Sequence, residues 1–201
     1  MIKKITIVAL LMFIAGVHSA PSQAALISFN PDAQAVGLGE IATVDLQISG
    51  LGDDILTGFD LDIGFDNSIL GFQSFTFGTG LDTFGFGTIN GATDFGSGLV
   101  NIFEISFDFD QDLKDFQPDD FILGTFTFNT LNIGTSPLDI SVNSLAGESV
   151  FDPVLGFEVA SSLQADLQLG SISVVPVPPA IWLFGTALIG LIGAGKLRKA
   201  P

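Results

Sequence analysis

Apolar and polar residues alternate with a period of two along much of this chain. The longest run covers residues 59–66, where every odd position from Phe59 to Phe65 is apolar and the even positions carry Asp60, Asp62, Asp66 or glycine. Residues 44–48 alternate in the same way. A period of two places successive side chains on opposite faces of a β-strand, so these segments are expected to be strands with one buried face.

Similar short apolar runs recur along the chain, separated by Gly, Asn, Asp and Pro. They lie at residues 72–77, 99–110, 121–128, 138–142, 157–159 and 163–169, with turn residues at 50–53, 66–67 and 117–119. No long helical pattern precedes the C-terminal tail. Many short strands spaced about ten residues apart predict an all-β fold, an antiparallel β-sandwich of the jelly-roll type over residues 25–172.

The first 24 residues have the three parts of a secretory signal peptide. Lys3 and Lys4 precede an apolar stretch at residues 5–16, and Ser22-Gln23-Ala24 forms a small-x-small cleavage site. Cleavage is therefore expected between Ala24 and Ala25. The alternative is an uncleaved anchor, but the apolar stretch is shorter than the ~20 residues that span a bilayer.

The part of the chain after this peptide is strongly acidic. All 22 acidic residues lie between Asp32 and Asp166, whereas Lys114 is the only basic residue between positions 25 and 175. Nucleic acid is excluded as a partner, because binding it requires cationic side chains that neutralise phosphates. The chain has no cysteine, so burial in one core must stabilise the domain without disulfides.

The 20 phenylalanines, without any tyrosine, are expected to serve mainly as core residues. Most of them fall on the apolar side of an alternating strand, where each ring buries a large area. The exceptions are Phe77, Phe84, Phe86 and Phe95, which lie among Gly and Thr. That segment is interpreted either as a loop that presents aromatic rings to a ligand or as a loosely packed connection.

The residue types of most catalytic sites are missing from the domain. Residues 25–175 contain no His, Cys, Tyr or Arg, which excludes nucleophile–histidine pairs and histidine metal sites. A pair of carboxylates among Asp60, Asp62 and Glu104 could hydrolyse a glycoside if they shared a cleft. Their places in alternating strands indicate a solvated face instead, so we expect that the protein is not an enzyme.

One acidic segment has the spacing of a calcium-binding loop. Asp108, Asp110, Asp112, Asp115 and Asp119 stand at offsets 0, 2, 4, 7 and 11. The match is incomplete, because Leu113 takes the glycine position, Lys114 adds an opposing charge and Asp119 replaces a glutamate. The sequence requires no cofactor; it suggests calcium at these five residues, with the polar face of a strand followed by an acidic turn as the alternative.

The strand patterns over most of residues 27–170 resemble those of a cohesin module. In that family a strand ends in an aromatic-Asp-Pro-x-x-Leu element, and residues 65–70 here match it with Asn67 in place of Pro. Residues 39–46 resemble the opening turn and strand, and residues 120–138 resemble the second conserved region. The resemblance implies a cohesin-like sandwich that binds a dockerin-like protein through one face of a sheet.

The C-terminal tail resembles the PEP-CTERM sorting signal of Gram-negative bacteria. A proline motif is followed by an apolar stretch and a basic end, and Val177 stands where the family has Glu. The motif is Val175, Pro176, Val177, Pro178 and Pro179, and the basic end holds Lys196, Arg198 and Lys199. The resemblance implies recognition by an exosortase-type membrane protease, cleavage near the prolines and transfer to the cell surface, often beside exopolysaccharide production.

The apolar stretch of the tail, at about residues 180–195, is expected to form a transmembrane helix. Its length corresponds to about 24 Å of helix against ~30 Å of hydrocarbon, so it would span a bilayer only marginally. A permanent single-pass anchor is the alternative to a cleaved signal. In either case the basic end stays inside and the acidic domain faces out.

These features predict three regions: a signal peptide at 1–24, a cohesin-like domain at 25–172 and a sorting signal at 173–201. The expected function is that of an exported, non-enzymatic binding or matrix protein, sorted to the membrane, cell surface or extracellular matrix. Its partner would be a dockerin-like protein. The alternative is a carbohydrate-binding module, although the one tryptophan, Trp182, lies in the tail and ring-stacking tyrosines are missing.

Overall fold

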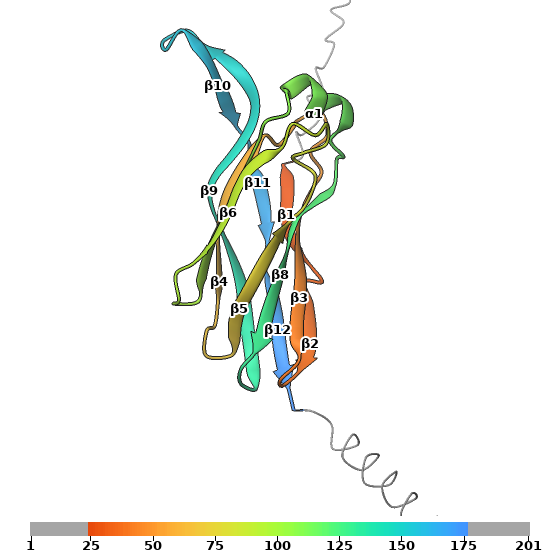
Figure 1. Ribbon diagram of the computed structural model, residues 1–201, viewed down its shortest axis with the longest axis vertical. Helices are drawn as coiled ribbons and strands as arrows, with labels where there is room; N and C mark the ends of the chain where they lie inside the picture. Colours follow the sequence, from red (N-terminus) through yellow and green to blue (C-terminus); the bar gives the residue numbers. More distant parts are fainter. Residues whose placement is uncertain (1–23, 177–201) are drawn as a thin grey trace, which may run out of the picture.

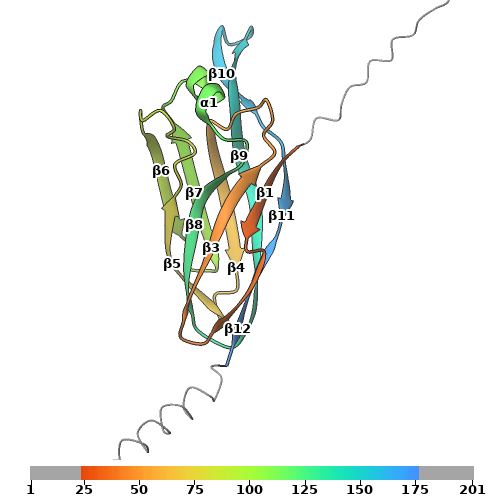
Figure 2. The same cartoon turned by 90° about the vertical axis from the view of Figure 1, so that its right-hand side faces the viewer.

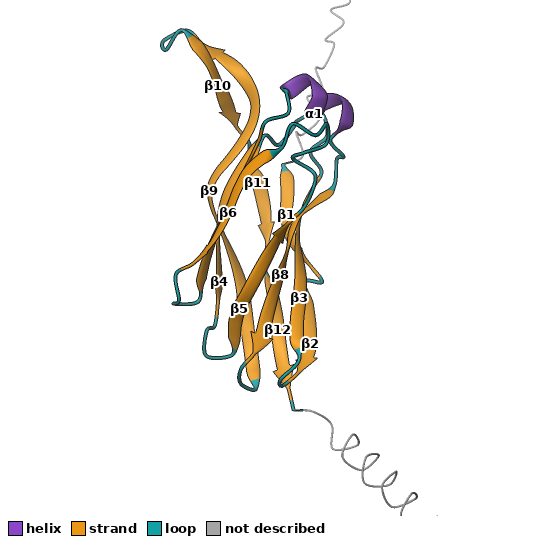
Figure 3. Ribbon diagram, in the orientation of Figure 1, coloured by secondary structure: helices purple, strands orange, loops and turns teal. Residues whose placement is uncertain are grey.

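The alternating segments form the strands of two β-sheets that pack face to face. The structure is a computed structural model that describes residues 24–176, and Figures 1 and 2 show its two layers from directions 90° apart. Most of the described chain is strand, with one short helix at the end of the sandwich (Figure 3). The predicted all-β sandwich is therefore confirmed.

The sheets contain five and seven strands. The first sheet has the order β11 (Ala165–Gln168), β1 (Ala25–Asn30), β3 (Ile41–Ser49), β8 (Phe121–Thr130) and β5 (Leu70–Phe77). The second has the order β2 (Ala33–Gly37), β12 (Gly170–Val175), β9 (Gly134–Asp152), β4 (Gly58–Phe65), β7 (Leu99–Ser106) and β6 (Thr88–Asp94), and β10 (Phe157–Ser162) pairs with β9.

Two strand pairs depart from the predicted antiparallel arrangement. β1 pairs with β11 in parallel, and β2 pairs with β12 in parallel. The cause is that the chain crosses from the first sheet to the second twice. The N-terminal segment crosses between β1 and β2, and the C-terminal segment crosses between β11 and β12. Because both segments run in the same direction, each pair of terminal strands is parallel and the sandwich is mixed.

The core lies between the inner faces of the two sheets. On β3 and β4 the apolar positions of the alternating runs are buried as predicted, including Val44, Leu46, Leu61 and Ile63. Phe126 of β8 is also fully buried. At ~25 cal/mol per Å² of apolar area removed from water, this continuous layer is the main stabilising term for a domain without disulfides.

The expectation that most phenylalanines are core residues is only half right. Four described phenylalanine side chains are buried and five more pack against the core: Phe29, Phe59, Phe126 and Phe128, then Phe65, Phe72, Phe75, Phe77 and Phe121. Phe103 is half-buried outside the core, and the other eight are exposed: Phe84, Phe86, Phe95, Phe107, Phe109, Phe116, Phe151 and Phe157. Phe77 was expected in a loop but packs against the core from the end of β5.

Among residues 24–176 there is one short helix, α1 (Asp110–Phe116), and it begins at the last residue of the strand that was predicted over residues 99–110. β7 ends at Ser106, and α1 lies over the adjacent end of the sandwich (Figure 1). Leu113 is the buried residue of α1, and the backbone N–H of Gln117 donates to the carbonyl of Leu113 at the C-terminal end. Burial of one leucine is sufficient for a two-turn helix whose stability comes from packing rather than from length.

The two ends of the sandwich differ. α1 and the hairpin of β9 and β10 lie at one end, which we call the distal end, and the chain leaves the domain after Val175 at the other end (Figures 1 and 2). Residues 147–162 of this hairpin, here called the ribbon, project beyond the sheets (Figure 1). Val154 at the tip of the ribbon is 90% exposed.

Candidate functional site

The outer face of the seven-stranded sheet carries a row of apolar and small residues near the distal end. Strand register aligns Ile89 of β6 with Ile105 of β7, Ile105 with Gly58 of β4, and Gly58 with Ala146 of β9. On β7 the inward positions are Val100, Ile102 and Glu104, so the odd-numbered residues of this strand point away from the core. Two small residues beside Ile105 leave a hollow in this face.

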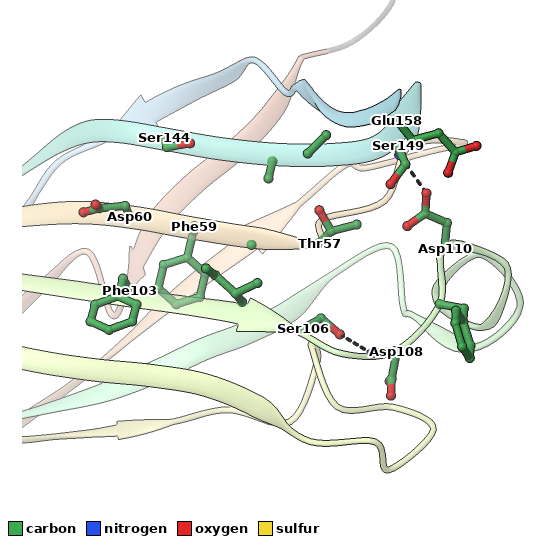
Figure 4. Close-up of a pocket in the computed structure, with 15 residues that line it drawn as sticks. Thr57, Phe59, Asp60, Phe103, Ser106, Asp108, Asp110, Ser144, Ser149 and Glu158 are labelled. Carbon is green, nitrogen blue, oxygen red and sulfur yellow. Dashed lines mark hydrogen bonds between the residues drawn. The ribbon is translucent and has the colours of Figure 1, made fainter. Parts of the chain in front are cut away.

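This hollow is the floor of a pocket of about 750 Å³. Phe103 and Ile105 line it from β7, Phe109 and Asp110 from the start of α1, and Ser149, Glu158 and Ala160 from the ribbon (Figure 4). The backbone N–H of Ser149 donates to Asp110 Oδ2 at 2.7 Å, which joins the ribbon to α1 at the distal end of the pocket. The pocket therefore has walls from three elements that are distant in sequence.

Exposed phenylalanines form a cluster beside this pocket, here called the aromatic crest: Phe84, Phe86, Phe109 and Phe116. Ring centroids lie 5.3 Å apart for Phe84 and Phe86, 5.9 Å for Phe84 and Phe116, and 5.6 Å for Phe86 and Phe109. More than half of each side chain is exposed. Phe109 belongs both to the crest and to the pocket wall, so the two features form one surface.

Two side chains position the aromatic crest. Asp108 accepts hydrogen bonds from the backbone N–H groups of Phe84 at 2.9 Å and Phe86 at 3.1 Å, which ties their loop to the end of β7. The Gln117 side chain accepts from the backbone N–H of Leu56 and donates to the carbonyls of Leu56 and Gly80. These bonds hold three loops against α1, so the backbone that carries the exposed rings is fixed in place.

Glu104 was expected on a solvated face, and this is wrong. It is 2% exposed and lies on the inner side of β7, where it occupies the position in the strand that follows Val100 and Ile102. Burial raises the pKa of Glu104, and the charge of Asp82 raises it further, whereas hydrogen bonds from Thr88 and Asn90 lower it. The alternation of β7 is correct, but its last inward residue is a carboxyl group.

Glu104→Gln is expected to raise the free energy of unfolding at pH 7. A carboxyl group whose pKa is raised by folding stabilises the fold while it is protonated, and this contribution is lost as the pH rises through the folded pKa. The gain of the variant should therefore shrink as the pH falls through the raised folded pKa, and it should be lost below 4.5, the ordinary glutamate pKa. Urea unfolding at several pH values measures this, with the exposed Glu158→Gln as the matched control. Destabilisation by Glu104→Gln at pH 7 would contradict it.

Asp60 and Asp62 lie on the outer face, as predicted. Asn101 Nδ2 donates to Asp60 Oδ1 at 2.6 Å and to Asp62 Oδ1 at 2.8 Å, and Asn143 Nδ2 donates to Asp60 at 3.1 Å. Glu104 is on the opposite side of the same sheet. The three carboxylates therefore do not share a cleft, and Asp60 and Asp62 are held by the same Asn101 side chain.

The five residues of the suggested calcium loop are not brought together. α1 begins at Asp110, so the segment is helical where the spacing would require a loop. Asp108 and Asp110 bind the backbone groups described above, Asp115 accepts from Gln111, and Asp119 accepts from the backbone of Gly52. Asp112 is half-buried on α1. In residues 24–176 no group of three or more acidic or histidine side chains is arranged to hold a metal, and calcium binding stays a prediction.

The structure describes only part of the terminal signals. Ala25 is the buried first residue of β1, and Ala24 precedes it. Val175 ends β12, three residues beyond the predicted boundary at 172, and its carbonyl accepts from the backbone N–H of Leu38 at 2.9 Å. Val177, Pro178, Pro179, Lys196, Arg198, Lys199 and the predicted helix at 180–195 lie outside the described residues. Within residues 24–176 no helix is long and apolar enough to cross a membrane.

Sequence reasoning missed the pocket residues Ile105, Phe109 and Gly58. The sequence did contain a signal for Ile105 and Phe109. Residues 99–109 carry apolar side chains at both even and odd positions, whereas a strand with one solvated face carries them at every second position. Such a pattern indicates a strand whose outer face is apolar as well. Gly58 could not be identified, because its role depends on its register with β7 and β9.

Comparison with solved structures relates this fold to cohesins. The seventh ScaB type I cohesin of Pseudobacteroides cellulosolvens matches with a TM-score of 0.58 and 14% identity, over 78% of this chain and 96% of that one. The sixth cohesin of scaffoldin B from Acetivibrio cellulolyticus, solved in complex with a Cel5 dockerin, matches with a TM-score of 0.57 and 15% identity, over 76% and 100%.

A third match is a cohesin–dockerin complex, Coh-OlpA-Doc918, from Clostridium thermocellum. Its TM-score is 0.55 at 11% identity, over 76% of this chain and 100% of that one. The chain matches no protein-family model and no curated protein. At these identities the comparisons show the fold, which is a cohesin-like β-sandwich.

Proposed function

We propose that the protein is a non-catalytic binding protein whose cohesin-like domain holds a protein partner at its distal end. The observation that carries this proposal is the pocket of about 750 Å³, which has an apolar floor and lies beside four exposed phenylalanines. Contiguous exposed apolar surface of this kind marks interaction sites in soluble domains. Aromatic side chains are also enriched in the cores of protein interfaces.

The structural neighbours support the class of partner. Two of the solved cohesins described above were crystallised with dockerins. A dockerin-like protein is accordingly the partner that we propose for this chain. The aromatic crest supports a protein in preference to a glycan, because it offers phenylalanine rings without the hydroxyl or indole N–H groups that Tyr and Trp add to a sugar-binding platform.

We also propose that the protein is exported and then sorted through its C-terminal tail by an exosortase-type enzyme. The motif from Val175 to Pro179 and the basic end support this, as do the acidic charges confined to residues 32–166. Intact-mass analysis of the chain from a native-like host should show loss of the residues beyond about Pro178 in the surface or medium fractions. A full-length species confined to the inner membrane would show a permanent anchor instead.

The partner proposal is tested by Ile105→Ser, with Ile133→Ser as its matched control. The two isoleucines are 53% and 57% exposed, but Ile105 lies in the pocket and Ile133 lies in the turn before β9, at the opposite end of the sandwich. Loss of one well-buried apolar contact at an interface costs on the order of 1–3 kcal/mol, so Ile105→Ser should weaken binding about 10-fold or more.

The measurement is capture of envelope proteins by the tagged full chain, quantified by mass spectrometry beside glycan-array binding. The proposal expects one protein that is depleted with Ile105→Ser and retained with Ile133→Ser. Equal retention by both variants would show that the pocket is not the binding site. A glycan whose binding is lost with Ile105→Ser would establish the carbohydrate-binding alternative, in which the crest rings stack on sugars.

A further inference from the structure

The chemistry of the pocket changes along the strands that form its floor. The row nearest the distal end is apolar, with Ile105 of β7, Gly58 of β4 and Ala146 of β9 in register. The next row aligns Gly91, Phe103, Asp60 and Ser144, and the Phe103 ring covers Gly91, whose added Cβ would lie 2.7 Å from Phe103 Cε1. The apolar floor of the pocket is therefore next to the carboxylate of Asp60, which lies two residues beyond Gly58 on β4.

Carboxylates also border the other side of the pocket. Glu158 from β10 and Asp110 from α1 lie together at the distal end, whereas Asp60 lies toward the middle of the sheet (Figure 4). No cationic side chain lines the pocket. The single basic residue of the described chain, Lys114, already pairs with Glu148 at 2.6 Å. The apolar floor is thus enclosed between negative charges on two sides.

These carboxylates can accept further hydrogen bonds. Asp60 receives Asn101 and Asn143 at one oxygen, Oδ1, and its Oδ2 has no protein donor among the described residues. An ionised carboxylate offers about four acceptor positions. Cationic donors form its strongest and shortest hydrogen bonds. A Lys or Arg side chain from a partner fits this site better than a neutral or acidic group.

We infer that the pocket selects a protein segment that combines a large apolar side chain with Lys or Arg on its flanks. The apolar side chain would contact Ile105, Phe103 and Phe109, and the flanking cations would face Asp60 on one side and Asp110 or Glu158 on the other. This choice of a cationic partner segment rests on charge complementarity. A second copy of this chain, an acidic polysaccharide and a phosphorylated ligand would all be repelled, because the domain carries 22 acidic residues against one basic residue.

This inference rests on the proposed partner-binding function, and it is tested with defined peptides. Three labelled 12-residue peptides are compared by fluorescence anisotropy with the full chain in a mild non-ionic detergent: one with Leu flanked by Lys, one with Leu flanked by Glu and one with Ser flanked by Lys. The Lys-flanked Leu peptide should bind at least 10-fold more tightly than either of the others. Its affinity should fall as salt rises from 50 to 500 mM.

Variants assign that binding to the pocket. Ile105→Ser should reduce binding of the Lys-flanked Leu peptide at least 5-fold, and Asp60→Asn combined with Glu158→Gln should reduce it and weaken its salt dependence. Asp139→Asn, which removes an exposed charge from β9 near the opposite end, is the control and should leave binding unchanged.

Two results would overturn the inference. The first is equal binding of the Lys-flanked and Glu-flanked Leu peptides, which would show that flanking charge does not matter. The second is equal binding of the two Lys-flanked peptides without any response to Ile105→Ser, which would show general attraction to an acidic surface. Neither result decides the proposed function, because capture of a native partner through Ile105 is measured separately.

Discussion

Replacing Phe126 by Ala is expected to lower the free energy of unfolding by about 3–5 kcal/mol. Phe126 is fully buried on β8, and its ring centroid lies 4.5 Å from that of Phe75, 5.8 Å from that of Phe128 and 6.3 Å from that of Phe72. The substitution removes the largest type of core side chain at the centre of this aromatic group and leaves a cavity. A domain without disulfides has a total stability of roughly 5–15 kcal/mol, so the loss would be a large share.

Phe157→Ala is the matched control for this prediction. It makes the same change at a side chain that is mostly exposed on the ribbon, where a surface substitution is expected to change stability by about 0.5 kcal/mol or less. Urea unfolding of both variants followed by circular dichroism measures the difference. Similar losses for the two would show that β8 does not pack in the core as described.

Gly98→Ala is expected to destabilise the fold by roughly 2–4 kcal/mol. Gly98 has a φ of +80°, a conformation that L-residues rarely adopt, and an added Cβ would overlap the carbonyl oxygen of Phe65. The carbonyl of Gly98 also accepts from the backbone N–H of Phe65 at 2.8 Å. The clash is with backbone and cannot be relieved by a rotamer change, so the turn before β7 must shift.

Gly96→Ala separates the two causes of that effect. Gly96 has a φ of +72° in the same turn, but nothing lies within 4 Å of an added Cβ. The control therefore carries only the conformational cost of about 1–2 kcal/mol, and Gly98→Ala adds the clash. Chemical unfolding of both variants gives the comparison, and equal losses would show that a Cβ at position 98 does not clash with the Phe65 carbonyl. Since β7 carries Phe103 and Ile105, Gly98→Ala should also weaken partner binding.

The parts of the fold that sequence could predict are those with strong local patterns. Residues 44–48 of β3 and 59–63 of β4 alternate without interruption, and their apolar residues are buried as the period requires. β6 was not predicted, because Thr88–Asp94 contains the Asn, Gly and Asp typical of turns. It is a strand because its backbone pairs with β7 along its whole length, and such pairing is not encoded in local composition.

The candidate site was harder to predict than the fold because it depends on contacts between distant segments. Its floor aligns residues from β7, β4 and β9, and its rim comes from α1 and the ribbon. Local propensity says nothing about which strands become neighbours. Asp108 illustrates the difference: its spacing predicted a metal ligand, whereas the structure uses it to hold the loop of Phe84 and Phe86.

The central claim is that a protein partner binds at the distal end, and site-specific photo-crosslinking tests it most directly. Benzoylphenylalanine would replace Phe109 at the pocket wall in one sample and Phe95 in another; both side chains are exposed, but Phe95 lies in the turn at the opposite end of β7. Irradiation in the producing cell should link one discrete protein to position 109 and none to position 95. The account would be contradicted if a discrete protein were crosslinked only at position 95, or if no protein were crosslinked at either position.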